Sequence, residues 1–183
     1  MDKDNTVIWF PASANLPVEI IGRRVYCRRD MLRWECSQAQ ADMRVFIERM
    51  NVVLAERYRP TATATPDGTE NVRKAAEVLG QVTQWAELNR PARNDFMVVP
   101  AFGKFHAMLR SKSHDLLVRM YGRPAEHRTV ELPAYLEKSF GDADTMEYGP
   151  EHEISFCMFL IALFKLHHLT CADEHYVVSV LFD

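Results

Sequence analysis

The sequence predicts a mainly α-helical protein, built as a single-domain bundle of four principal helices followed by an apolar C-terminal helix. Apolar residues recur at helical spacing through most of the 183 residues. An apolar content of 48% is enough for a sizeable core, and seven glycines and nine prolines are too few for a loop-rich or fibrous chain. We expect a helical body over residues 1–149, with residues 150–183 packed on the same domain.

The N-terminal region predicts a short apolar element and then a helix. Residues 7–10 are continuously apolar and fit either a strand or a plug in the core. Pro17 stands at a position typical of a first helical turn. The first helix is therefore expected over about residues 18–35.

The middle of the chain has the clearest helical periods. Residues 37–58 place apolar side chains on one helical face, and Arg59-Pro60 ends that helix. A capping box of Asp67 and Glu70 predicts the start of a third helix. The inward residues expected on these two helices are Met43, Phe46, Met50, Val53, Leu54, Tyr58, Val72, Val78, Leu79, Val82 and Trp85.

The last part of the chain predicts two more helices, a loop and a terminal helix. A fourth helix is expected over residues 104–121, capped by Gly122, and a short one over 133–140. An acidic loop, 141–149, then leads to a helix that is apolar nearly all round, which indicates burial on several sides. Residues 176–182 are β-branched and aromatic enough for a strand, and we predict that they pair with or contact residues 7–10.

Composition also indicates where the protein is found. The longest apolar run, residues 154–164, is too short for a membrane-spanning helix, which needs about 20 residues. The N-terminus lacks the anatomy of a secretory signal, and four scattered cysteines fit reduced thiols better than a disulfide framework. These features predict a cytoplasmic protein with no membrane association.

Charge is distributed unevenly along the chain. The net charge is −3, yet residues 130–183 hold two basic and ten acidic side chains, whereas residues 1–129 hold 20 basic and 15 acidic ones. This asymmetry favours either an anionic partner for the body or head-to-tail contact between copies. Two solvated surfaces of different sign explain it equally well.

Histidines and cysteines near the C-terminus form a candidate zinc site. Three of them are spaced i, i+4 and i+8, so an unbroken helix would place them on one face, and zinc accepts such nitrogen and sulfur ligands. Against this, Thr170 and Asp173 form an N-cap pattern that interrupts a helix inside the site. Buried neutral cysteines and capping or surface histidines are the alternative. The candidate ligands are Cys157, His167, Cys171 and His175, with His152 as an alternative to Cys157.

Arginines of the first predicted helix form a second candidate site. Five arginines fall within residues 23–33, among them Arg24 and Arg28 at i, i+4, with Tyr26 and Trp34 close by. Such a stripe suits phosphate binding, because arginine donates several hydrogen bonds to an anion. A solvated face paired with neighbouring carboxylates explains the same pattern.

Catalytic motifs are lacking in the sequence. There is no G-x-S-x-G, H-E-x-x-H or P-loop pattern, and no cysteine lies in a nucleophile signature. His106 and His114, with Asp115, fall at i, i+8 on the fourth predicted helix, where they are typical of a solvated helix side. We therefore expect a protein that is not an enzyme.

Short stretches over about residues 7–121 match one known family in the same order. They are residues 7–10, 12–14 and 16–21, then 38–41, 58–60 with a Thr-rich loop, 78–79 and 82–83 followed by Arg90, Arg93 and Asn94, and lastly 109–111 and 116–118. In this order they resemble the coat proteins of rigid rod-shaped plant RNA viruses of the tobamovirus type. The loop between the third and fourth helices is shorter than in that family, and the acidic block after residue 140 has no counterpart.

The resemblance implies a non-enzymatic structural protein, a four-helix subunit that self-associates around single-stranded RNA, with Arg90, Arg93 and Arg110 near the phosphates. The alternative from a different class is a helical protein-interaction module or regulator that binds a protein partner through the C-terminal apolar helix, with or without stabilisation by zinc.

Overall fold

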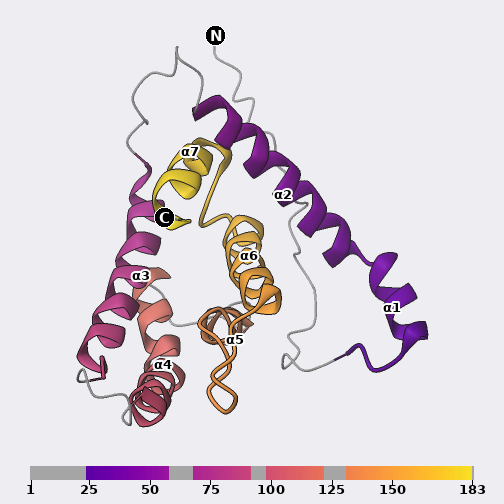
Figure 1. The fold of residues 1–183 in the computed structure, drawn as a ribbon. Coiled ribbons are helices and arrows are strands. Elements are labelled where there is room, and N and C mark those ends of the chain that lie inside the picture. The colour runs from indigo at the N-terminus through magenta and orange to yellow at the C-terminus, as the bar shows by residue number, and fades with distance from the viewer. Residues whose placement is uncertain (1–23, 58–67, 92–97, 122–130, 183) are drawn as a thin grey trace. The chain divides into compact units, whose positions relative to one another are not determined.

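The computed structural model describes residues 24–57, 68–91, 98–121 and 131–182, and every regular element within them is helical (Figure 1). The prediction of a mainly α fold is therefore confirmed. The described residues form two compact units, one of residues 24–57, 68–73 and 161–182 and the other of residues 74–91, 98–121 and 131–160. The predicted division of the chain at residue 149 stays a prediction.

The first unit is built around the long helix α2. Its elements are α1 (Arg28–Glu35), α2 (Gln38–Arg57), the first turn of α3 (Glu70–Leu88), the end of α6 (Pro150–Lys165), the 3₁₀ turn η3 (Cys171–Asp173), the short helix α7 (Glu174–Tyr176) and the π-helical turn η4 (Val177–Leu181). Figure 1 shows α7 beside the C-terminal half of α2. Hydrogen bonding from Gln40 N–H to Ser37 Oγ, at 3.2 Å, satisfies one free donor at the start of α2.

Apolar residues of α2 at helical spacing form one side of this unit's core. Met43, Phe46, Met50 and Val53 are buried as predicted, whereas Leu54 is 37% exposed. The Phe46 ring centroid lies 6.2 Å from that of Phe164, at the end of α6. Aromatic contact and helical spacing together explain how α2 buries this face.

The second unit contains the rest of α3, α4 (Val98–Tyr121), α5 (Glu131–Lys138) and the first part of α6. Lys112 Nζ lies 5.8 Å from the Trp85 ring centroid, which joins α4 to α3. Arg110 Nε donates to Glu137 Oε1 at 2.9 Å, which joins α4 to α5. The core of this unit holds Val78, Val82, Trp85, Phe105, Leu109, Leu116, Leu117, Met120, Leu132, Leu136, Phe159 and Leu160.

Helix α6 is buried on several sides, as its composition predicts. Phe159, Leu160, Ile161 and Leu163 are each at most 2% exposed, although consecutive residues point in different directions around a helix. Among the described residues, no helix has the length and apolar character needed to cross a membrane.

Three predicted elements differ from the structure. Residues 176–182 are helical rather than a strand, because Val177, Val178 and Leu181 are buried at helical spacing and tertiary packing overrides their β-propensity. Helix α4 begins at Val98 rather than residue 104, since Pro100 lies in the first turn, where its missing N–H costs nothing. In the described chain the first helix begins at Arg28, and residues 7–10 lie outside the described residues.

Candidate interaction site at the loop before α6

The loop between α5 and α6, residues 141–149, is closed by its own hydrogen bonds. Asp142 N–H donates to Glu147 O at 3.0 Å, and Met146 N–H donates to Asp142 O at 2.9 Å. The Asp142 carboxylate accepts the backbone N–H groups of Asp144 and Thr145 at 2.9 and 3.0 Å. The bonds from Thr145 and Asp144 lower the pKa of the Asp142 carboxyl. These hydrogen bonds fix the backbone conformation of the loop.

Glycine at position 141 is required by this backbone. Its φ is +98°, a conformation that L side chains rarely adopt. A Cβ there would lie 3.1 Å from Glu147 O and 3.2 Å from Phe102 Cζ. The turn out of α5 therefore brings the loop directly against α4.

His106 of α4 contacts the backbone at the beginning of the loop. It is buried, and its Nε2 lies 3.3 Å from Phe140 O. Because a carbonyl only accepts, Nε2 carries the proton in this contact. The Phe102 ring meets the imidazole edge-on at a centroid distance of 4.6 Å. Burial lowers the pKa of His106, so the ring is neutral at neutral pH.

His152 of α6 supports the same turn from a second helix. It is buried, and its Nδ1 donates to Lys138 O at 2.7 Å. The ring of Tyr148 stacks on the imidazole with centroids 5.5 Å apart. Carbonyls at the end of a helix lack partners within it. The two histidines therefore cap the C-terminal end of α5, at residues 138 and 140.

The outer surface of the loop is acidic and carries an exposed aromatic ring. Tyr148 is 62% exposed although its ring contacts His152. Exposed carboxylates lie along the same stretch of chain, at Asp144, Glu147 and Glu151. Tyrosine on a rigid backbone is a frequent anchor of protein interfaces, because it has few rotatable bonds to immobilise.

We predict that acidification destabilises the protein through His106. A lowered pKa means that the unfolded chain binds the proton more readily, so the stability that neutral His106 contributes is present above the ordinary histidine pKa and is lost as pH falls below it. Urea unfolding of the wild type and of His106→Gln between about pH 7.5 and pH 5.5 measures this. Glutamine can still donate a hydrogen bond to Phe140 O but does not titrate. The free energy of unfolding of His106→Gln should therefore fall less on acidification than that of the wild type. His114→Gln, at an exposed site, is the control; equal losses in all three proteins would contradict the prediction.

The candidate zinc ligands do not form a common site in the structure. Helix α6 ends at Lys165, and His167 has a φ of +55°, so the i, i+4, i+8 positions do not share one helix face. The predicted N-cap is confirmed, since Thr170 N–H donates to Asp173 Oδ2 at 2.9 Å. Burial raises the pKa of the Cys157 thiol, which opposes the thiolate that zinc requires. Within the described ranges, no three His, Cys, Asp or Glu side chains are grouped so that they could hold a metal ion. The geometry therefore does not support a zinc site formed by Cys157, His167, Cys171 and His175.

The candidate phosphate-binding arginines are dispersed over the chain. Arg110 is paired with Glu137 at 2.9 Å, and Arg90 lies 3.3 Å from Glu87 after the end of α3. Arg24 and Arg28 are exposed in the first unit, and Arg93 lies outside the described residues. Two of the five are therefore already next to carboxylates.

The sequence does not predict that His106 and His152 cap α5, and it indicates His152 only as an alternative zinc ligand. The position of His106 at i, i+8 from His114 predicts a solvated helix side, yet His106 is 3% exposed. Its contact with Phe140 joins positions 34 residues apart, and no local spacing reveals such a pair. The sequence does contain one usable signal, since Gly141 followed by Asp142 and Thr145 is typical of a turn in which aspartate accepts backbone N–H groups.

The described part of the chain is thus a helical fold that presents an ordered, acidic loop with an exposed tyrosine, a combination of features frequent at protein interfaces. The family model described as phosphotyrosyl phosphate activator (PTPA) protein matches residues 21–183. Because this match covers most of the sequence, the chain belongs to the PTPA family.

Curated relatives carry consistent names. A protein of Cryptococcus neoformans named serine/threonine-protein phosphatase 2A activator 2 is 26% identical over 162 residues, which are 87% of this chain and 41% of the relative. The activator 2 of Candida glabrata is 27% identical over 170 residues, 89% of this chain and 46% of the relative. The activator of Drosophila melanogaster is 27% identical over 166 residues, 88% and 40%. The chain thus spans less than half the length of these relatives.

The family match overturns the resemblance to tobamovirus coat proteins. The stretches behind that resemblance, such as residues 38–41 and 116–118, lie on the amphipathic helices α2 and α4. Apolar and polar residues alternate in this way on any such helix. The prediction of a coat-like protein that self-assembles around RNA is therefore wrong, and the predicted alternative, a regulator that contacts a protein partner, agrees better with the relatives.

Proposed function

We propose that this chain regulates a serine/threonine protein phosphatase 2A by binding it directly. The observation that carries the proposal is membership of the PTPA family, whose relatives in fungi and in an insect are named as activators of that phosphatase. The chain matches less than half of those relatives, so binding and activation are separate properties to test.

The loop before α6 is the proposed contact surface. Its backbone is fixed by the turn at Gly141 and by the two histidine caps, so little conformational entropy is lost when a partner binds. Tyr148 supplies an exposed ring that is already oriented by His152. The surrounding carboxylates favour a basic surface on the phosphatase.

Tyr148→Ala is expected to weaken binding to the phosphatase by about tenfold or more, because tyrosine is enriched among the few interface residues whose truncation costs about 2 kcal/mol or more. The measurement is the Kd of the immobilised chain for purified phosphatase 2A, with stimulation of phosphopeptide dephosphorylation recorded in parallel. Leu88→Ala removes a side chain that is 76% exposed in the same unit, and it should bind like the wild type. A wild-type chain that does not bind would refute the function, and equal affinities of Tyr148→Ala and Leu88→Ala would refute the surface.

A further inference from the structure

Helix α1 buries none of its residues in the described structure. It has eight residues, and three apolar side chains in and beside it are exposed: Tyr26 at 71%, Leu32 at 55% and Met31 at 46%. Helices this short are marginal in water unless they pack against something. A short helix that carries exposed apolar side chains and buries none of its residues is therefore suited to contact another molecule.

The same helix carries three arginines, Arg28, Arg29 and Arg33, against two carboxylates, Asp30 and Glu35. The Asp30 carboxylate accepts Tyr26 N–H at 3.1 Å and Cys27 Sγ at 3.4 Å, and it lies 3.8 Å from Arg33. The hydrogen bonds from Tyr26 and Cys27 lower the pKa of the Asp30 carboxyl, which favours its ionised form. This carboxylate is therefore already engaged within α1. Arg28 and Arg29 form no ion pair with any carboxylate in the described part of the chain.

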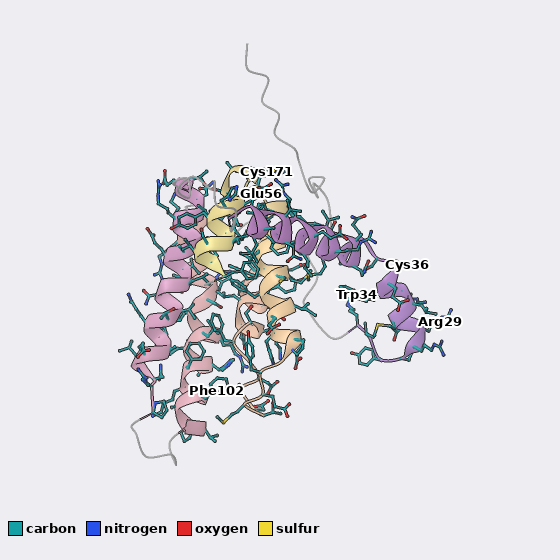
Figure 2. The ribbon with its side chains drawn as sticks, turned by 45° about the horizontal axis from the view of Figure 1, so that its top comes forward. Arg29, Trp34, Cys36, Glu56, Phe102 and Cys171 are labelled. Carbon is teal, nitrogen blue, oxygen red and sulfur yellow. The ribbon has the colours of Figure 1, made fainter. Side chains whose placement is uncertain are left out.

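Basic and apolar side chains share neighbouring faces of α1. Arg28 lies three and four residues before Met31 and Leu32, so it is on their face, and Arg29 and Arg33 form the adjoining row at i, i+4. Figure 2 shows Arg29 and Trp34 directed to different sides of the helix. Such a surface offers an apolar contact bordered by positive charge.

We propose that α1 is a docking surface for an acidic segment of a protein partner, one that carries apolar residues beside its carboxylates. The arginines of α1 favour a partner segment with acidic side chains. The exposed Leu32 and Met31 favour a segment that also carries apolar side chains. A lipid surface fits less well, because eight residues bearing Asp30 and Glu35 give a small, interrupted apolar face. Only the identity of the partner as the phosphatase rests on the proposed function.

The test uses fluorescence anisotropy with the full chain and a labelled helical peptide that carries glutamates on one face and leucines on the other. A counterpart peptide has lysine in place of every glutamate. The wild type should bind the acidic peptide and not the lysine peptide, and its affinity should fall between about 50 and 300 mM NaCl. Arg29→Glu with Arg33→Glu should weaken binding about tenfold, and Arg29→Gln with Arg33→Gln by a smaller factor.

Lys104→Glu with Arg119→Glu, which makes the same change in net charge at exposed sites on α4, should leave peptide affinity unchanged. Circular dichroism of each variant checks that the helices are retained. Binding of both peptides alike, an Arg29 and Arg33 reversal that binds as tightly as the wild type, or binding only to anionic phospholipid vesicles would overturn the proposal. Phosphatase affinity, measured on the same variants, is a separate readout: failure of the wild type there refutes the proposed function and leaves the peptide result intact.

Discussion

Asp173→Ala is expected to lower the free energy of unfolding by about 3 kcal/mol or more. The Asp173 side chain is fully buried and accepts hydrogen bonds from Thr69 N–H at 3.1 Å, Thr170 N–H at 2.9 Å and the Thr170 hydroxyl at 3.0 Å. Alanine leaves all three donors without this acceptor. One carboxylate joins the start of α3 to the turn that begins α7, so its loss affects two elements of the first unit.

Urea denaturation of Asp173→Ala, Asp173→Asn and Asp115→Ala measures this effect. Asparagine keeps one oxygen acceptor, so its loss should lie between those of the wild type and the alanine variant. Asp115 is 78% exposed, and its replacement should cost no more than about 0.5 kcal/mol. If Asp173→Ala were as stable as Asp115→Ala, the capping role of Asp173 would be wrong.

Lys165→Met is expected to cost a similar amount, about 3 kcal/mol, because it leaves a buried carboxylate without its cation. Lys165 Nζ is paired with Asp42 Oδ2, and Asp42 is 4% exposed. Gln38 Nε2 donates to the other oxygen of Asp42 at 2.8 Å. The pair therefore joins the start of α2 to the end of α6 within the first unit.

A double-mutant cycle separates the ion pair from lost packing. Asp42→Asn with Lys165→Met removes the buried charge, so it should recover about 1 to 2 kcal/mol relative to Lys165→Met alone. Arg90→Met breaks an exposed pair with Glu87 and should change stability by less than about 1 kcal/mol. A double variant less stable than Lys165→Met would contradict a dominant electrostatic effect.

Helices with a strong apolar period were predictable from the sequence. Met43, Phe46, Met50 and Val53 mark the buried face of α2 by spacing alone, and all four are buried. Residues 176–182 misled the prediction, because Val177, Val178 and Leu181 satisfy both a β-branched composition and a helical spacing. Thr170, which the sequence predicts as an N-cap, begins the helical turns η3, α7 and η4. Residues 177–181 continue these turns as a helix instead of forming a strand.

The candidate site depends on contacts between residues far apart in the sequence. His106 and His152 cap carbonyls at the end of α5 from two different helices, and neither contact leaves a periodic trace in the sequence. The arginine stripe of α1 indicates an anionic partner but not its class. The placement of Arg90, Arg93 and Arg110 near RNA phosphates rests on the resemblance of short helical stretches to a coat protein. Stretches of a few residues carry helical period and little family information, whereas the PTPA match extends over residues 21–183.

Hydrogen–deuterium exchange of this chain, with and without purified phosphatase 2A, tests the central claim most directly. Binding should slow exchange in peptides that cover residues 141–154, since the loop and the first turn of α6 would be covered by the phosphatase. Unchanged exchange across residues 141–154 at a saturating phosphatase concentration, or protection confined to segments outside them, would contradict it.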